Sequence, residues 1–355
     1  MILKFQLVPR TLKFRFDAGT SRGVLKTRNI WWIKAVNSKD SRIGWGEAAP
    51  LVRLSVDDRP DFEAKVQDFL NEFSNYDFPE EQESLLAFIK DIVPSDFPSL
   101  RFGLEMAIMD FFQDGEKRFF PNNFYDGQKP IPINGLIWMG DRNFMREQID
   151  AKIRQGFTCI KMKIGAIDFE QELELLRYIR ERFSEDELTL RVDANGAFST
   201  MEAISKLERL AELGIHSIEQ PIAAGQWAEM SKLCAKTPLP IALDEELIGI
   251  RDKGLLLDHI KPQHIILKPT LIGGFLESEE WIEEAEKRAI GWWMTSALES
   301  NIGLNAIAQL ASKFNPRVPQ GLGTGQLYHN NLNSPLVISA GHIRYQKDLS
   351  WEVPR

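Results

Sequence analysis

The sequence contains few of the residues that build thiolate or imidazole sites. Its 355 residues include two cysteines, Cys159 and Cys234, and five histidines. The cysteines form no CxxC pair and the histidines no HxH or HExxH pattern. This excludes a disulfide framework and disfavours a zinc site. So few cysteines also fit a reducing cytoplasm.

Long apolar runs and excess positive charge are absent as well. No run approaches the roughly 18–20 apolar residues of a membrane span, and the opening MILKFQLVPRTLKFRF lacks the unbroken apolar segment of a signal peptide. A net charge of −8 opposes binding to nucleic acid or to an anionic membrane, since both reward a basic surface. We therefore expect a soluble cytoplasmic protein, either a monomer or a homo-oligomer, that acts on a small molecule.

From about residue 130, short β-prone runs alternate with longer amphipathic stretches such as 168–183. Strands that alternate with helices predict parallel β-α units, and eight such strands predict a closed barrel. The expected fold is α/β, a modified TIM barrel of the (β/α)7β type that lacks its last helix. The predicted strands are 130–137, 157–164, 188–195, 216–222, 240–245, 264–269, 292–297 and 317–323.

The first 130 residues have the order of a separate α+β domain, with strands before helices. β-prone runs at 2–8, 11–17 and 30–36 precede a predicted turn at 42–51 and helical patterns near 60–75, 80–92 and 99–114. A β-like run at 336–346 is expected to return to the first domain. The predicted division is a capping domain at 1–128, a catalytic barrel at 129–325 and a tail at 326–355 that packs back on the capping domain.

Charged residues occur at corresponding positions of successive predicted strands. In GFTCIKMKIG (156–165), Lys161 and Lys163 are two residues apart, so both side chains leave the same face of an otherwise apolar strand. The predicted strands that follow each end in a charged residue, and about one β-α unit separates each of these residues from the next. Because catalytic groups of parallel barrels collect at the carboxyl ends of strands, these residues are predicted to converge. They are Lys161, Lys163, Asp193, Glu219, Asp244 and Lys268.

Three converging carboxylates would repel one another strongly without a cation between them. Oxygen ligands without histidine or cysteine favour a hard ion, Mg²⁺ before Mn²⁺ or Ca²⁺. The paired lysines disfavour each other's charge, so one of them is expected to be a neutral amine that can remove a proton. Such a set suits abstraction of a proton α to a carboxylate, with the metal stabilising the enediolate.

These stretches, in this order, resemble the enolase superfamily, in the muconate lactonizing enzyme-like branch with a Lys-x-Lys motif. Within that branch the chain most resembles the o-succinylbenzoate synthase family of lyases, which are dehydratases of menaquinone biosynthesis. The resemblance covers nearly the whole length. It rests on GWGEAAPL (44–51), INGLIWMG (133–140), IKMKIG (160–165), RVDANGAF (191–198), IEQPI (218–222), ALDEEL (242–247), ILKPTLIGG (266–274) and TSALESNIGL (295–304).

The resemblance implies a role for each residue of the site. Asp193, Glu219 and Asp244 would bind Mg²⁺, for which Mn²⁺ could substitute. Lys163 would be the base and then the acid in a syn dehydration of 2-succinyl-6-hydroxy-2,4-cyclohexadiene-1-carboxylate. Lys161 would keep Lys163 neutral and bind the substrate carboxylate, and Lys268 would stabilise the enediolate from its other face. Supporting or substrate-binding roles would fall to Asn195, Arg191, Glu245, Ser296 and Glu299, with a salt bridge inside the barrel equally expected for Arg191.

Other activities share this set of residues. A racemase would use Lys268 to return the proton, and N-succinylamino acids need no cation-binding site in the protein. Dipeptide epimerases are disfavoured, because QGLGTGQL (320–327) has no acid to pair with a substrate ammonium. Muconate-type cycloisomerisation has little in its favour, and a non-catalytic barrel would leave the charged residues without a reason.

Three further expectations concern segments outside the barrel strands. Glu47 and the loop 51–58 are expected to form a lid over the barrel mouth. GLGTG (321–325) is expected to be a turn that follows the eighth strand rather than a phosphate-binding loop. The acidic run 277–287 is expected to be a solvated helix face.

Overall fold

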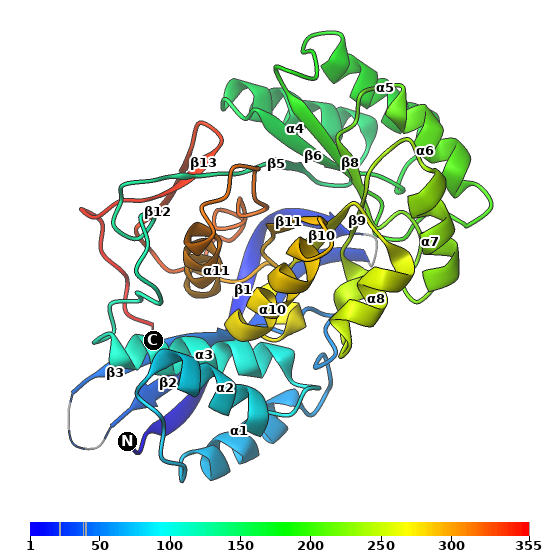
Figure 1. The fold of residues 1–355 in the computed structure, drawn as a ribbon. Coiled ribbons are helices and arrows are strands. Elements are labelled where there is room, and N and C mark those ends of the chain that lie inside the picture. The colour runs from blue at the N-terminus through cyan, green and yellow to red at the C-terminus, as the bar shows by residue number, and fades with distance from the viewer. Residues whose placement is uncertain (21–22, 38, 40, 355) are drawn as a thin grey trace.

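The computed structural model describes residues 1–20, 23–37, 39 and 41–354, and shows an antiparallel sheet with helices beside a parallel barrel (Figure 1). β1 (Lys4–Thr20), β2 (Gly23–Val36) and β3 (Ile43–Ala48) form the first sheet in that order. The predicted runs 2–8 and 11–17 therefore belong to one long strand, whose pairing with β2 shifts register between Lys13 and Ala18. Three helices follow: α1 (Phe62–Phe73) packs on β1, α3 (Pro98–Phe112) packs on β2 and β3, and α2 (Gln82–Ile92) packs against α3.

The predicted turn at 42–51 was wrong, because residues 43–48 form β3. Its glycines serve a close approach between backbones. A Cβ on Gly46 would lie 1.9 Å from the carbonyl oxygen of Gly103 in α3, and one on Gly44 would lie 2.0 Å from that of Ala107. The helix α3 is buried over nearly its whole length. Its backbone can contact β3 directly only where β3 has no side chain, as at these two glycines.

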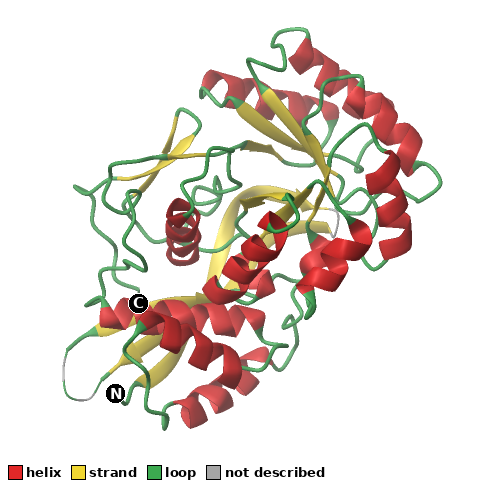
Figure 2. Cartoon of the chain, in the orientation of Figure 1, coloured by secondary structure: helices red, strands yellow, loops and turns green. Residues whose placement is uncertain are grey.

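Seven parallel strands follow, in the spatial order β11-β10-β9-β8-β7-β6-β5, with helices on their outer side (Figure 2). The strands are β5 (Gly135–Ile137), β6 (Cys159–Lys163), β7 (Thr189–Asp193), β8 (Ser217–Glu219), β9 (Ile241–Leu243), β10 (His264–Leu267) and β11 (Gly291–Met294). The helices are α4 (Arg142–Arg154), α5 (Phe169–Arg180), α6 (Ala203–Ala211), α7 (Trp227–Lys236), the short 3₁₀ helix η1 (Glu245–Leu247), α8 (Lys253–Ile260), α9 (Pro269–Ile272), α10 (Phe275–Glu286) and α11 (Asn301–Lys313).

Two residues close the barrel in place of the eighth predicted strand. Gln320 bridges to Ile133 next to β5, and Gly321 bridges to Thr295 next to β11. Their backbone hydrogen bonds reach Pro132 on one side and Met294 on the other. The run 317–323 is thus reduced to two bridging residues, followed by a turn at 323–326 as expected. The α/β fold is a modified TIM barrel with an N-terminal α+β cap.

The last strands, β12 (Leu336–Ser339) and β13 (His342–Tyr345), form a small sheet with β4 (Ile131–Pro132) at the entrance to the barrel. The Tyr345 ring also lies 4.8 Å from that of Tyr125. The tail therefore contacts both the barrel and the segment before it. The domain boundaries at 128/129 and 325/326 stay predictions.

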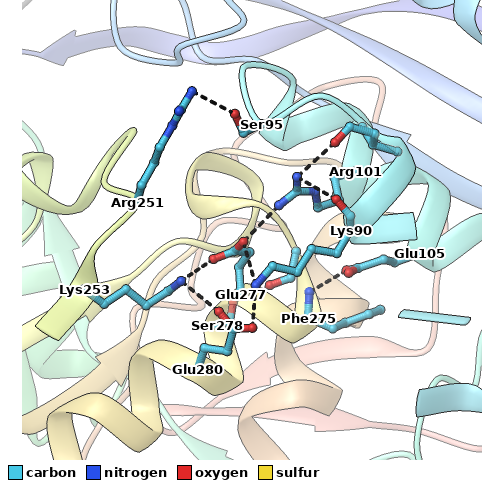
Figure 3. A network of polar contacts seen from close by, with 12 residues as sticks. Lys90, Ser95, Arg101, Glu105, Arg251, Lys253, Phe275, Glu277, Ser278 and Glu280 are labelled. Carbon is cyan, nitrogen blue, oxygen red and sulfur yellow. Dashed lines mark hydrogen bonds and ion pairs between the residues drawn. The ribbon is translucent and has the colours of Figure 1, made fainter. Parts of the chain in front are cut away.

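A network of ion pairs joins the helices of the cap to α8 and α10 of the barrel (Figure 3). Glu277 of α10 lies 3.0 Å from Arg101 Nη1, 3.2 Å from Lys90 Nζ and 2.5 Å from Lys253 Nζ, and Glu280 lies 2.9 Å from Lys253 Nζ. The expectation of a wholly solvated acidic face at 277–287 was wrong for these two glutamates. Their charges are neutralised by lysine and arginine side chains that only the folded chain brings close.

Candidate active site

The strand register brings the predicted catalytic residues together. Lys163 lies opposite Asp193 on the neighbouring strand, and Asp193 lies opposite Glu219 on the next. Lys161 lies opposite Arg191, two residues earlier. Because side chains alternate along a strand, residues two apart share the inner face of the barrel. The spacing of the sequence had predicted this common height.

The remaining two charged residues follow the next strands. Asp244 comes directly after β9, and Lys268 comes directly after β10. The Lys268 ammonium is paired with the Asp244 carboxylate and lies 3.9 Å from Glu219 Oε1. The carboxyl ends of five successive strands thus supply one continuous set of charges.

Both lysines of β6 contact the same carboxylate oxygen. Asp193 Oδ2 lies 3.0 Å from Lys161 Nζ and 2.9 Å from Lys163 Nζ. Lys161 is also paired with Glu219, and Lys163 donates a hydrogen bond of 2.7 Å to Asn195 Oδ1. Asp193 and Glu219 are almost completely buried, so these contacts are shielded from water and strong.

The carboxylates favour the charged form of Lys161 and of Lys268. Burial alone would lower the pKa of Lys161, but the charges of Asp193 and Glu219 outweigh it and raise the pKa above its usual value. The pKa of Lys268 is raised in the same way by Asp244 and Glu219. For Lys161 the attraction to these acids therefore outweighs both burial and repulsion from the other lysine, and Lys161 is held as an ammonium.

The pKa values of two of the acids shift in opposite directions. Burial would raise the pKa of Asp193, but Lys161 and Lys163 lower it well below its usual range. Burial and the nearby charge of Asp193 raise the pKa of Glu219. These carboxyl groups could all be ionised at once only if more positive charge were present between them.

The donor set fits a hard divalent cation. Three carboxylates lie on the ends of adjacent strands, and Glu219 Oε1 is buried without a hydrogen-bond partner. Over residues 1–20, 23–37, 39 and 41–354, no three acidic, histidine or cysteine side chains are already drawn together around one ion position. The lysine ammonium groups hold these oxygens instead, so binding an ion would require the acids to exchange lysine contacts for metal contacts.

Two supporting residues, Asn195 after β7 and Glu245 after β9, join strand ends on either side of β8. Asn195 accepts from Lys163 and donates through Nδ2 to Glu245 Oε1 at 3.0 Å. Burial raises the pKa of Glu245, and the charge of Asp244 adds to the effect. Asn195 has a φ of 44°, a left-handed conformation that asparagine tolerates better than most residues. It therefore orients Lys163 from a fixed turn.

Arg191 differs from both of its expected roles. Its side chain is buried and stacks on the Trp293 ring at 4.0 Å, while Nη1 donates to the Pro319 carbonyl at 2.8 Å. No carboxylate is among its partners in the described part of the chain, and it does not line the cavity described below. Through this hydrogen bond Arg191 holds the segment that closes the barrel, because that segment forms only two backbone bridges to the neighbouring strands.

Ser296 and Glu299 lie one behind the other after β11. Ser296 lines the cavity, accepts from Thr324 Oγ1 at 2.7 Å and donates to Glu299 at 2.6 Å. Glu299 is completely buried and also accepts from Thr270. Glu299 therefore positions the wall and does not face the cavity.

Glu47 is not the lid residue that was expected. It is completely buried and accepts hydrogen bonds from the backbone N–H groups of Ser300, at 2.8 Å, and Gly303, at 3.0 Å. These groups begin α11, where unpaired N–H groups favour an anionic partner. From the loop 51–58, only Leu51 lines the cavity.

The cavity has a volume of about 350 Å³, and the site residues that line it are Lys161, Lys163, Asp193, Asn195, Lys268 and Ser296. Sequence reasoning missed some of the residues that shape it. Lys152, Asn134 and Thr324 line it. Gln220, with φ of 40°, accepts from the backbone N–H of Asp244 through its side chain at 3.2 Å. The motif IEQPI marked Gln220, whereas no local pattern distinguished Lys152 from an ordinary basic residue at the end of a helix.

Comparison with known proteins agrees with this geometry. Residues 144–349, more than half of the chain, match the family described as enolase C-terminal domain-like. An o-succinylbenzoate synthase from Desulfotalea psychrophila is 48% identical over 93% of this chain and 95% of its own length. The crystal structure of MenC from Desulfotalea psychrophila LSv54 superposes with a TM-score of 0.86 at 41% identity, covering 97% of this chain and all of that one.

A more distant relative has another activity. An N-succinylamino acid racemase from an Amycolatopsis species is 28% identical over 68% of this chain and 64% of its own length. The family match, the high identity and the nearly full coverage together place the chain. The protein belongs to the o-succinylbenzoate synthase family, in the muconate lactonizing enzyme-like branch of the enolase superfamily.

Proposed function

We propose that the protein dehydrates 2-succinyl-6-hydroxy-2,4-cyclohexadiene-1-carboxylate to 2-succinylbenzoate and water, a step of menaquinone biosynthesis. The observation that carries the proposal is the grouping of Lys163, Asp193 and Lys268 in the wall of one cavity. The high identity to an o-succinylbenzoate synthase supports the same substrate.

Lys163 is the residue proposed to move the proton. Its Nζ takes the proton on the ring carbon that carries the carboxylate, and the electron pair passes into that carboxylate. The pair then forms the new ring double bond as the hydroxide leaves from the adjacent carbon. Lys163 returns the proton to the hydroxide, and water is released. One lysine on one face suffices for such a syn elimination.

The other two lysines supply fixed positive charge. Lys161, held as an ammonium between Asp193 and Glu219, faces the substrate carboxylate and opposes protonation of Lys163. Lys268 comes from β10, three strands away from β7, and stabilises the enediolate from its other side. Charges held in place by buried partners need no reorganisation during the reaction.

Enzymes of this superfamily use a divalent metal ion, and we propose Mg²⁺ here. Asp193, Glu219 and Asp244 would hold it, because carboxylate oxygens are the ligands that Mg²⁺ prefers. Bound Mg²⁺ would supply the charge that stabilises the two adjacent enediolate oxygens.

A racemase reaction on N-succinylamino acids is the second candidate. It is favoured by the presence of lysines on two sides of the same cavity and by the N-succinylamino acid racemase relative. Dipeptides are disfavoured, since residues 320–327 contain no acid. Exchange of the α-proton in deuterated water would detect the racemase reaction.

The test follows the ultraviolet change of the cyclohexadiene substrate with Mg²⁺, with a chelator, and with Lys163→Ala. We expect Mg²⁺-dependent aromatisation that Lys163→Ala reduces by about 10²–10⁴-fold or more, the usual contribution of a positioned base. Lys206→Ala is the control, because Lys206 is paired with Glu202 outside the cavity. Absence of turnover in folded wild-type protein with Mg²⁺ would refute the proposal.

A further inference from the structure

One buried acid near the site takes no part in the set of charges at the strand ends. Glu172 belongs to α5, is only 1% exposed and does not line the cavity. Its Oε2 atom is buried without a hydrogen-bond partner in the described part of the chain. Burial raises the pKa of this carboxyl to about 7, although backbone hydrogen bonds oppose the shift. A buried acid with an unpaired oxygen costs stability, so its position calls for an explanation in function.

The other oxygen of Glu172 holds the turn that connects β6 to α5. Oε1 accepts hydrogen bonds from the backbone N–H groups of Gly165, at 2.6 Å, and Ala166, at 3.2 Å. The N–H of Ile167 makes a longer contact of 3.5 Å with the same atom. Successive N–H groups of this kind form a concave site for an anion. Since Asp168 already caps α5 with its own side chain, Glu172 serves the turn rather than the start of the helix.

This turn directly follows the proposed base. Lys163 is the last residue of β6, and Gly165 comes two residues later. The pairing of β6 with β5 ends at Met162, whereas its pairing with β7 extends to Lys163, opposite Asp193. The N–H of Ile164 donates to the carbonyl of Asp193 at 2.9 Å. The backbone of Lys163 is therefore fixed by β7 on one side and by the turn that follows it.

The turn also contacts the loop that orients the Lys163 side chain. Gly165 has a φ of 92°, and a Cβ on it would lie 2.5 Å from the Cβ of Ala197 in the loop after β7. The same loop carries Asn195, whose Oδ1 accepts from Lys163 Nζ at 2.7 Å. A shift of the turn would therefore move Lys163 relative to Asn195.

We propose that Glu172 is a positioning residue, which holds the turn after β6 and thereby places the Lys163 amine at the proton of the substrate. This inference rests on the proposed function, in which Lys163 moves the proton. Glu172 acts through the N–H groups of the turn and touches neither the cavity nor the other lysines of the site. Displacing a reacting group by about 1 Å can lower a rate by about 10²-fold.

The first test compares two substitutions of Glu172 in the ultraviolet turnover assay with Mg²⁺. Glu172→Leu removes the acceptor and should lower kcat about tenfold or more, because Lys163 is displaced. KM and the affinity for the product 2-succinylbenzoate, measured by titration calorimetry, should stay within about twofold of the wild type. Glu172→Gln keeps an oxygen that can accept from the same N–H groups, and should retain most of kcat.

Two further variants complete the comparison. Glu170→Leu removes an exposed acid of the same helix, which pairs with Arg209, and should change neither kcat nor KM. Gly165→Ala disturbs the turn from its other side, against Ala197, and should lower kcat with little change in KM. It carries the same test if Glu172→Leu does not fold.

A second readout needs no substrate. Cyanate carbamylates neutral amines, and mass spectrometry gives the rates at Lys163 and Lys161 separately. In Glu172→Leu, Lys163 should react about threefold faster or more relative to Lys161, because its contacts with Asn195 and Asp193 loosen. A purely structural role of Glu172 would leave this ratio unchanged.

The outcomes separate this inference from the proposed function. Turnover by the wild type with an unchanged kcat in Glu172→Leu would refute the role of Glu172 alone. Parallel losses of kcat and product affinity would also refute it, because they indicate a general disturbance of the cavity. A wild-type protein without turnover would overturn the proposed function, and the cyanate ratio would then decide whether Glu172 positions Lys163.

Discussion

Glu47 joins the cap to the barrel, and its replacement by glutamine should remove a measurable part of the pH dependence of stability. Burial raises the pKa of Glu47 to about 7, although hydrogen bonds from Ser300 oppose the shift. The folded state therefore holds this proton more tightly than the unfolded state, whose carboxyl has the ordinary pKa of 4.5. Its contribution is greatest below pH 4.5 and is lost as the pH rises toward 7 and above.

The magnitude follows from the two pKa values. Between pH 5 and pH 8 the linkage relation gives a loss of about 2.5 kcal/mol in the free energy of unfolding, at about 1.36 kcal/mol for each pKa unit. Glu47→Gln does not titrate, but it loses at least one of the hydrogen bonds to Ser300 and Gly303, a constant cost of about 1–2 kcal/mol. The wild type should thus be the more stable protein at pH 5 and should lose that advantage by pH 8.

Urea denaturation of both proteins at pH 5, 6, 7 and 8 measures the effect. The quantity of interest is the difference between the two unfolding free energies, because the other titrating groups cancel in it. A difference that stays constant to within about 0.5 kcal/mol from pH 5 to pH 8 would refute the reasoning. It would mean that Glu47 is ionised in the fold throughout this range.

Two further predictions concern the contacts between cap and barrel. Glu277→Gln should lower the free energy of unfolding by about 3 kcal/mol, because it leaves the mostly buried Lys253 without its nearest acid. The control is Glu283→Gln, exposed on the same helix, which should change the free energy of unfolding by less than about 0.5 kcal/mol. Equal effects of the two substitutions in thermal unfolding would contradict the prediction. Gly46→Ala should cost more than about 4 kcal/mol or prevent folding, since its Cβ would lie 1.9 Å from the Gly103 carbonyl; a Tm within a few degrees of the wild type would show that α3 can move away from β3.

Much of the barrel was predictable because its signals are local. Each parallel strand is a short apolar run between amphipathic helices, and the structure places all but the last of the eight predicted strands within a few residues of their predicted positions. The common height of Lys163, Asp193 and Glu219 was also predictable, since β-α units of similar length bring equivalent positions into register. The family match is consistent with that reading.

The errors came from features that depend on distant parts of the chain. Gly44 and Gly46 have the pattern of a turn, and only the position of α3 shows why the strand lacks side chains there. Glu47 stands in a motif that suggested a lid, yet the N-terminus of α11 is its partner. The eighth predicted strand forms only two bridges, because its pairing depends on the positions of the two edges that it joins and not on its own sequence alone.

The sequence by itself determined the kind of chemistry: lysines and carboxylates at equivalent positions of successive strands, with few histidines and cysteines to bind a softer metal. These are properties of residue type and spacing, which the chain carries whether folded or not. Only the tertiary structure decided how the charges pair. Lys161 is held as an ammonium because Asp193 and Glu219 reach it from the two strands that follow its own. Pairing depends on distances of a few ångströms and on burial, and neither is set until residues far apart in sequence pack together.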